Sequence, residues 1–203
     1  MKKVLLLGST GTAGSALAKK LISDTDCYIT LFSRHAETVY SNTVRIKAVN
    51  GDALSIDDLK SVMNGVDVVY CAISGSSLPE IAENIVNVMS EKDVKRLIFM
   101  GAVGIYNEIP DGIDGEDNLD NEPEQIPNRK SVDVVEASNL NYTVLRPGYL
   151  IDGDENDYVL TVKGEPAKGY TTPIPALVKF AEQLILNDEL YSRESVSITR
   201  DNT

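Results

Sequence analysis

Three glycines near the N-terminus stand at a spacing that suits the binding of an anion. Gly8, Gly11 and Gly14 directly follow the short apolar run Val4–Leu7, and a pattern typical of an amphipathic helix begins after them. Glycine is needed where a side chain would block a phosphate group or keep a helix away from a strand. The free N–H groups at the start of such a helix point at the anion, and the helix dipole adds to the attraction. We therefore interpret this segment as a phosphate-binding turn.

The spacing G-x-x-G-x-x-G is one residue wider in its first interval than the dinucleotide fingerprint of dehydrogenases. The strand before the turn and the helix after it favour dinucleotide binding, with a tight structural turn as the alternative. A P-loop is excluded, because no lysine follows Gly14 at the required position. The expected contacts to the dinucleotide phosphates are Gly8, Ser9, Thr10, Gly11, Thr12, Ala13 and Gly14.

The end of the second predicted strand bears on the form of the dinucleotide. An acidic residue at this place, about 20 residues beyond the last glycine, would bind the ribose 2′-hydroxyl and favour NAD. The sequence has Ser33 and Arg34 instead, and both are donors suited to a 2′-phosphate. This pair predicts NADP(H) in preference to NAD(H), with a solvated surface arginine as the alternative.

Two further turns are expected at the same edge of the sheet. Asp52 and Ala53 follow the third predicted strand, and Asp52 is suited to accept a hydrogen bond from an adenine amino group. Ala72, Ile73, Ser74 and Gly75 follow the fourth predicted strand, where we expect the ribose and the nicotinamide. Both expectations follow from the rule that ligands bind beyond the carboxyl ends of parallel strands.

Strand-like and helix-like segments alternate through the first half of the chain, which predicts a doubly wound parallel sheet of the α/β (Rossmann) class. The predicted strands are Val4–Leu7, Tyr28–Phe32, Val44–Val49, Val66–Ala72 and Leu97–Met100. We expect residues 1–203 to form a single dinucleotide-binding domain. Its core is expected at about 1–146, followed by a small substrate-side lobe at about 147–203 in the same domain.

The alternation breaks after Tyr106. Eight acidic residues lie between Glu108 and Glu124, and with three prolines they predict a long irregular loop over about 107–126. Such an acidic rim would disfavour strongly anionic substrates. Later elements are predicted at Lys130–Ser138 (helix), Tyr142–Leu145 (strand), Leu177–Leu186 (helix) and Ser195–Thr199 (strand).

Composition excludes several classes of function. The formal net charge of −12 disfavours general binding of nucleic acid, because most of the surface repels phosphate. Cys27 and Cys71 do not make a disulfide framework, and the single histidine, His35, has no neighbouring ligand for a metal site. No metal is therefore expected. Neither a signal peptide nor a membrane-spanning run is found, so no membrane association and a cytoplasmic location are expected.

Taken together, the chain resembles the atypical short-chain dehydrogenase/reductases, and within them the NmrA-like NAD(P)H-binding proteins that include flavin and biliverdin reductases. The resemblance covers nearly the whole chain and rests on Gly8–Gly14, Ser33–Arg34, Gly51–Asp52, Gly104–Tyr106 and above all Leu140–Gly148. It implies that Arg146, Pro147 and Gly148 lie near the reactive end of the cofactor. Gly101 and Ala102, after the fifth predicted strand, are also expected to contact the cofactor.

The chain departs from that family at its usual catalytic residues. Short-chain dehydrogenases use a serine after the fifth strand and a Tyr-x-x-x-Lys on the next helix to transfer a proton. Here the serine position falls on Gly101 or Ala102, and the tyrosine and lysine positions fall near Glu124 and Asn128. No tyrosine lies between residues 107 and 141, so the usual carbonyl chemistry is not expected.

Two functions remain. One is an NADPH-dependent reductase of a flavin, quinone or similar small acceptor, favoured by the apparent substrate lobe after Pro147. The other is a non-catalytic NADP(H) redox sensor that acts through a protein partner. Tyr106 and Tyr149 are the phenols considered as proton donors, with packing or pocket lining as the alternative for each. A monomer and a homodimer are both compatible with the sequence.

Overall fold

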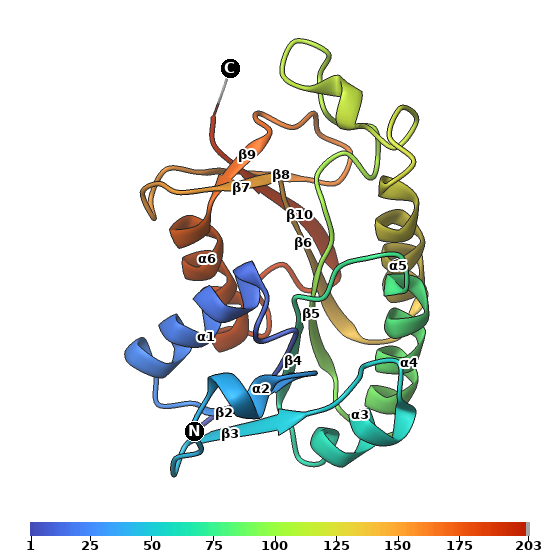
Figure 1. Cartoon of the computed structure of the whole chain (residues 1–203). Helices are drawn as coiled ribbons and strands as arrows, with labels where there is room; N and C mark the ends of the chain where they lie inside the picture. The colour runs from blue at the N-terminus through green and yellow to red at the C-terminus, as the bar shows by residue number, and fades with distance from the viewer. Residues whose placement is uncertain (202–203) are drawn as a thin grey trace.

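A central sheet organises the molecule (Figure 1). The computed structural model describes residues 1–201, and within them eight strands form one sheet in the order β3-β2-β1-β4-β5-β6-β10-β8. These strands are β1 (Lys3–Leu7), β2 (Tyr28–Ser33), β3 (Ile46–Asn50), β4 (Val68–Cys71), β5 (Arg96–Met100), β6 (Asn141–Pro147), β8 (Val159–Val162) and β10 (Glu194–Thr199). Neighbouring strands run parallel, except that β8 is antiparallel to β10. β7 (Tyr149–Ile151) and β9 (Thr171–Pro173) form a separate parallel pair.

Helices cover both faces of the sheet, which confirms the predicted doubly wound α/β fold. They are α1 (Thr12–Asp24), α2 (Ala36–Val39), α3 (Ile56–Met63), α4 (Leu78–Glu91), α5 (Gln125–Ala137) and α6 (Ile174–Leu186), with a 3-10 turn η1 (Gly115–Asp117). In Figure 1, α1 and α6 lie on one side of the sheet, and α3, α4 and α5 lie on the other.

Strand β1 shows why helices must pack on both faces of the sheet. Its side chains alternate, so Leu5 and Leu7 pack into the core beneath α3, α4 and α5. Val4 and Leu6 pack into the core beneath α1 and α6. A strand that is apolar at every position is stable only when helices remove both faces from water.

The structure differs from the predicted elements at several boundaries. β3 begins at Ile46, and Val44, which was expected to lie in this strand, is 90% exposed. α5 begins at Gln125, earlier than predicted, because Pro127 lies in the first turn, where its missing N–H has no helical partner. The strands β7, β8 and β9 and the short helix α2 were not predicted.

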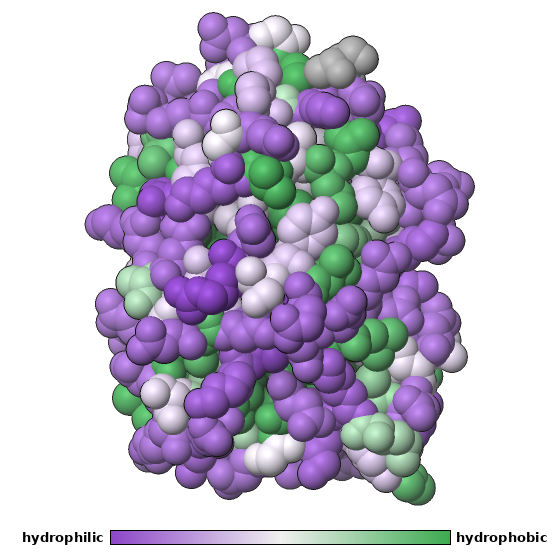
Figure 2. Space-filling view, turned by 180° about the vertical axis from the view of Figure 1, so that it is seen from behind, coloured by the Kyte–Doolittle hydropathy of each residue, from purple (hydrophilic) through white to green (hydrophobic). Residues whose placement is uncertain are grey.

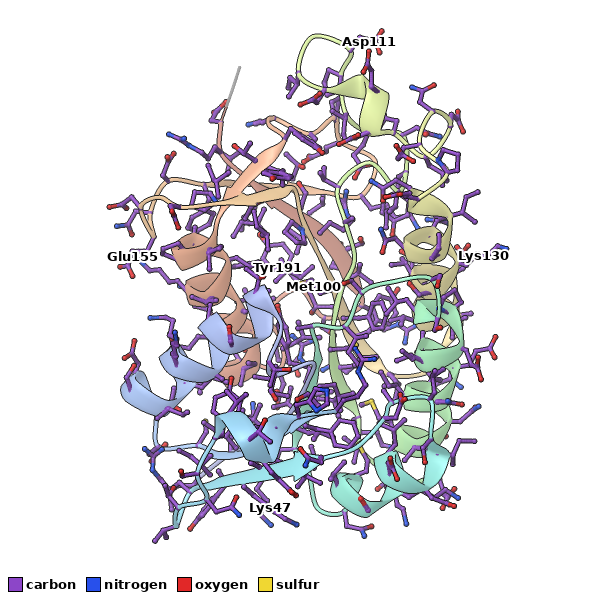
Figure 3. All side chains as sticks on the ribbon, viewed as in Figure 1. Lys47, Met100, Asp111, Lys130, Glu155 and Tyr191 are labelled. Carbon is purple, nitrogen blue, oxygen red and sulfur yellow. The ribbon has the colours of Figure 1, made fainter. Side chains whose placement is uncertain are left out.

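Hydrophilic residues predominate on the face opposite to that of Figure 1, which Figure 2 shows. The acidic segment between β5 and α5 lies at one end of the molecule, where Figure 3 labels Asp111, and Lys47 of β3 lies at the other. Within the described residues, we find no helix that combines the length and the apolar character needed to cross a membrane.

The strand register brings four loops to one edge of the sheet. Leu7, Phe32, Val49 and Cys71 are paired across β1, β2, β3 and β4, so they form one rung of the ladder. The residues that follow these four strands therefore leave the sheet side by side. This is the carboxyl edge, where parallel α/β sheets bind ligands.

Candidate functional site

The glycine turn after β1 packs too closely for larger residues. Gly8 has φ +80°, and its N–H donates to the carbonyl oxygen of Phe32 at 2.9 Å. A Cβ at Gly8 would lie 3.0 Å from the carbonyl of Ala72, and a Cβ at Gly14 would overlap the carbonyl oxygen of Gly8. The turn is thus held between β2 and β4, and two of its glycines are required by this packing.

Helix α1 begins at this turn with its first N–H groups uncapped. Its first hydrogen bond runs from Ser15 N to Gly11 O at 2.8 Å, and no side chain caps the helix at Gly11. The N–H groups of Thr12, Ala13 and Gly14 precede this bond and have no partner within the helix. No acidic residue occupies the first turn, so the positive end of the helix dipole is available to an anion.

The loops that follow β1, β2, β3 and β4 enclose a cavity of about 480 Å³. Of the predicted cofactor contacts, it is lined by Gly8, Thr10, Gly11, Ser33, Arg34, Asp52, Ala53, Ala72, Ile73 and Ser74. Gly75, expected with Ala72–Ser74 beside the ribose, also lines the cavity, and the lining residues that were not among the predicted contacts are Phe32, His35, Gly51, Leu54, Ser76, Ser77 and Ile81. Most of them could have been predicted from the rule that ligands bind beyond the carboxyl ends of parallel strands, if a few more residues after each strand had been included.

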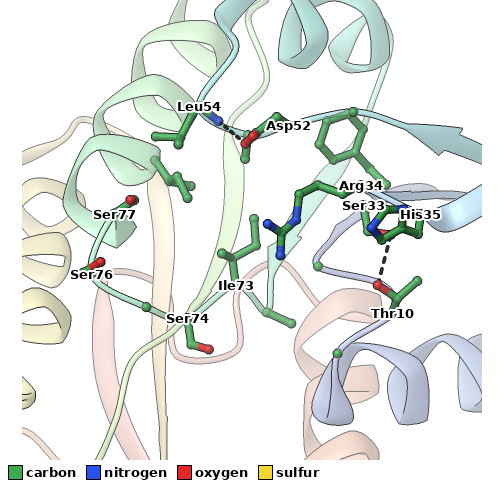
Figure 4. A pocket seen from close by; sticks show the side chains of 18 residues that line it. Thr10, Ser33, Arg34, His35, Asp52, Leu54, Ile73, Ser74, Ser76 and Ser77 are labelled. Atoms are coloured by element: carbon green, nitrogen blue, oxygen red, sulfur yellow. Dashed lines mark hydrogen bonds between the residues drawn. The ribbon is translucent and has the colours of Figure 1, made fainter.

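Arg34 supplies the positive charge of this cavity. Figure 4 shows its side chain in the middle of the lining residues, between Asp52 and Ile73. The side chain is exposed, and the described part of the chain holds no ion-pair partner for it. Nearby, Thr10 Oγ1 donates to Ser33 Oγ at 3.1 Å, which joins the glycine turn to the end of β2. A guanidinium that no protein carboxylate engages in the described chain is suited to hold a phosphate.

The Asp52 loop forms the opposite wall of the cavity. Leu54 N donates to Asp52 Oδ1 at 3.0 Å, and the N–H of Asp52 donates to Asp58 Oδ2 at 2.9 Å. Helix α3 is capped directly after this loop by Ser55 Oγ, which accepts from Asp58 N at 3.2 Å. The exposed carboxylate of Asp52 is thus held in place and keeps one oxygen available to a donor.

Several predicted contacts lie outside the cavity lining. Ser9 is buried, its carbonyl accepts from the Tyr40 hydroxyl at 2.6 Å, and its Oγ lacks a hydrogen-bond partner in the described chain. Thr12, Ala13 and Gly14 belong to the first turn of α1. Gly101 is buried where a Cβ would lie 3.3 Å from side chains of Val132 and Val144, and Ala102 packs at the edge of the same core.

Arg146 also lies away from the cavity. Its side chain is 0% exposed, forms an ion pair with Glu108 and donates from Nε to Ser195 Oγ at 3.0 Å. Side chains alternate along β6, so Arg146 faces the α5 side of the sheet, as Val144 does. This alternation could have indicated its direction from the sequence. The pairing with Glu108 could not be predicted, because it depends on the path of an irregular loop.

Pro147 is the last residue of β6, and Gly148 connects it to the β7–β9 pair. Pro147 is buried, and Gly148 N donates to Thr172 Oγ1 at 2.8 Å. A Cβ at Gly148 would overlap the carbonyl oxygen of Tyr170. The glycine of the Arg-Pro-Gly turn is therefore required by close packing against the chain that leads into β9.

The two candidate phenols have different surroundings. Tyr106 donates its hydroxyl to Glu136 Oε1 at 2.7 Å, and its ring lies near Arg129, Arg146 and Lys163, with distances of 4.6, 5.0 and 4.6 Å to the ring centroid. Burial and the neighbouring Glu136 raise the pKa of Tyr106, although a hydrogen bond to Ser195 opposes them. Tyr149 is 66% exposed on β7.

Neither phenol lines the cavity. The proton of Tyr106 is held by a carboxylate, and its raised pKa keeps the phenol neutral. In short-chain dehydrogenases a lysine lowers the pKa of the catalytic tyrosine. Here the lysine near Tyr106 is Lys163, and it pairs with Glu136 at 2.8 Å. The polar cluster of Tyr106, Glu136 and Lys163 ties the β5 loop to α5 and to the end of β8.

Comparison with known proteins identifies the family. A family model described as NAD(P)H-binding matches residues 8–188, and the chain belongs to this family. No curated protein shows significant sequence similarity to the chain.

Solved structures agree with this assignment. A Rossmann-fold NAD(P)-binding family protein from Shigella flexneri is 31% identical, with a TM-score of 0.85 over 100% of this chain and 95% of that one. A wide-type short-chain dehydrogenase/reductase from Veillonella parvula, solved with NADP, is 25% identical, with a TM-score of 0.89 over 100% and 96% of the two chains. An anaerobilin reductase from Escherichia coli O157:H7, 14% identical with a TM-score of 0.82 over 100% and 98%, shares the fold.

The residues present fit a dinucleotide. A glycine turn that a Cβ would fill, the first N–H groups of α1, a guanidinium with no ion-pair partner among residues 1–201 and a held carboxylate converge on one sheet edge. Phosphate, ribose and base need these kinds of partner in the Rossmann arrangement.

Proposed function

We propose that this member of the NAD(P)H-binding family is an NADPH-dependent reductase of a small acceptor such as a flavin or a quinone. The observation that carries the proposal is the cavity at the ends of β1 to β4, in which Arg34 has no ion-pair partner among the described residues. A bound NADPH supplies a hydride, and the remaining chemistry depends on the acceptor.

Each loop has a separate part in holding the cofactor. The N–H groups of Thr12, Ala13 and Gly14 bind the pyrophosphate at the start of α1. Ser33 and Arg34 bind the 2′-phosphate, and this contact selects NADPH over NADH because NADH lacks that group. Asp52 accepts from the adenine amino group with the oxygen that Leu54 N does not occupy. The loop Ala72–Ser74 lies beneath the ribose and leads toward the nicotinamide.

The surroundings of Tyr106 support an acceptor that needs little acid from the protein. Its hydroxyl is directed to Glu136, and Gly101 and Ala102 stand where related enzymes have a serine. Reduced flavins and quinones are anions stabilised by delocalisation, so solvent can protonate them after hydride transfer. A ketone would instead require a proton donor at the forming alkoxide. The solved relative with NADP supports the cofactor, and the anaerobilin reductase supports reductase chemistry on this fold.

A non-catalytic NADP(H) sensor is the second candidate. The engaged Tyr106 hydroxyl favours it, because a sensor needs no proton donor at all. Such a protein would distinguish NADPH from NADP⁺, consume neither and pass the difference to a protein partner.

One assay separates the two candidates. Purified protein is mixed with NADPH and a series of flavins and quinones, and the loss of NADPH absorbance is followed. The Arg34→Ala variant serves as the matched control, because it should lose most of its activity at the same low concentration of NADPH. Oxidation by wild type and not by the control supports the reductase. Tight binding of NADPH without oxidation by any acceptor contradicts the reductase and favours the sensor.

A further inference from the structure

A buried amide on α4 holds the wall of the cavity formed by the Asp52 loop. Asn84 is 8% exposed, and its Nδ2 donates to Leu54 O at 3.1 Å and lies 3.4 Å from Ala53 O. These contacts join residues 30 and 31 positions apart in the chain. A buried amide on an otherwise apolar helix face is costly unless its donors are used, so this pairing fixes where the loop can lie.

The loop has other tethers, which do not come from α4, and one of them joins Gly51 N to Ser33 O at the end of β2 at 3.1 Å. Asp58 Oδ2 accepts from Asp52 N at 2.9 Å, and Ser55 N donates to Asp52 O at 2.9 Å, but both contacts lie next to the start of α3. Asn84 is the contact that comes from α4, the helix that also carries the cavity-lining Ile81. Its loss would free the carbonyl groups of Ala53 and Leu54 from α4, and with them the carboxylate that Leu54 N holds.

We propose that Asn84 is a positioning residue for the adenine end of the cofactor, acting through the Ala53 and Leu54 carbonyls to hold the Asp52 carboxylate in place. This inference rests on the proposed function, in which Asp52 meets the adenine amino group. Asn84 does not line the cavity and does not touch the cofactor itself. Its effect is therefore on recognition of the base, whereas the phosphate contacts of α1 and Arg34 are independent of it.

The experiment compares NADPH with its hypoxanthine analogue, in which a carbonyl replaces the adenine amino group. Dissociation constants of both are measured by calorimetry for wild type, Asn84→Asp and Asn84→Leu. Aspartate keeps the shape of asparagine and removes its donors. We expect wild type to bind NADPH about 10-fold more tightly than the analogue, the value of about one hydrogen bond to a charged group. Both variants should reduce this ratio to about 2-fold or less, and should bind the analogue about as wild type does.

Asn87, on the same helix and exposed, provides the matched control. Asn87→Leu should keep the full ratio. An unchanged ratio in the folded Asn84 variants overturns the inference, as does an equal loss of affinity for both nucleotides. If Asn84→Asp does not fold, Asn84→Ser gives the same comparison, and failure of every variant at position 84 to fold assigns the residue to folding alone and overturns the inference. Failure of wild type to bind NADPH is a different result, which contradicts the proposed function.

Discussion

Two arginines were expected near a cofactor, Arg34 from its place after the second strand and Arg146 from the family resemblance, and the structure gives them opposite surroundings. Arg34 is exposed in the cavity beyond β2, with no ion-pair partner in the described chain. Arg146 is buried within β6, where Glu108 and Ser195 engage its guanidinium. A charge without a protein partner is available to a ligand, whereas a charge with a buried partner is committed to the fold.

The same difference separates the two halves of the sheet. The loops after β1 to β4 present unused donors and acceptors, namely the first N–H groups of α1, Arg34 and Asp52. The region after β5 and β6 presents groups that are already paired with one another, as Tyr106 is with Glu136. We propose that the loops after β1 to β4 bind the cofactor, whereas the paired groups around Tyr106 and Arg146 stabilise the fold.

The largest effect is expected at Arg146. Arg146→Met leaves Glu108, whose side chain is 6% exposed, as an unpaired buried carboxylate. The free energy of unfolding should fall by about 3–5 kcal/mol. The double variant Arg146→Met/Glu108→Gln removes the unpaired charge and should recover at least half of that loss. Urea denaturation of the three proteins measures both quantities. If Arg146→Met were as stable as wild type and had lost affinity for NADPH, Arg146 would be a cofactor contact and the contrast with Arg34 would be wrong.

Arg34 should show the opposite behaviour. Arg34→Ala is expected to weaken NADPH binding by about 10- to 100-fold, the value of a charge-assisted contact to a phosphate. Affinity for NADH and the midpoint of urea denaturation should stay the same. Calorimetry with both nucleotides tests the first statement. Equal losses for NADPH and NADH would mean that Arg34 does not recognise the 2′-phosphate.

Tyr106 tests whether the polar cluster takes part in chemistry. Tyr106→Phe keeps the ring beneath its three cationic neighbours and removes the hydroxyl that bonds to Glu136. We expect a loss of about 1 kcal/mol in stability and unchanged turnover of NADPH with a quinone. The double variant with Tyr149→Phe should behave in the same way. A large fall in kcat with normal stability would assign a chemical role to a phenol.

The smallest effect is expected in the acidic segment. Burial and the nearby Asp114, Glu122 and Glu116 raise the pKa of Asp117 above its ordinary value. The folded state therefore favours the protonated carboxyl, and ionisation makes folding less favourable as the pH rises through that pKa. Asp117→Asn should increase stability at pH 7 by at most about 0.5 kcal/mol, and the gain should disappear at pH values where both states are protonated. Thermal unfolding at neutral and acidic pH measures the difference.

The location of the turns after β1 to β4 could be predicted from the sequence, whereas the polar contacts of Arg146 and Tyr106 could not, for a physical reason. The glycine turn, Ser33, Arg34 and Asp52 each depend on a local pattern, a strand that ends at a turn, and the parallel register then brings those ends together. Arg146 depends on a contact with Glu108, whose position is set by how residues 107–126 fold. Tyr106 depends on Glu136, which reaches it only because α5 packs beside the loop after β5.

The short elements and one helix boundary were not predicted for a similar reason. β8 is four residues long and forms only because β10, far along the chain, offers an edge to pair with. The early start of α5 was missed because Pro127, taken by itself, indicates a loop. A proline is nevertheless tolerated in the first turn of a helix. Such features follow from tertiary contacts, which local propensity does not contain.

The central claim is that the cavity beyond β1 to β4 binds NADP(H) through the glycine turn and Arg34. The most direct test is calorimetric titration of nucleotide-free protein with NADPH, NADP⁺, NADH and NAD⁺ in parallel. We predict tight binding of NADPH, weaker binding of NADP⁺ and little response to NADH or NAD⁺. Equal affinity for NADPH and NADH would contradict the role of Arg34, and no binding of any of the four would contradict the interpretation of Gly8, Gly11 and Gly14 as a nucleotide-binding turn.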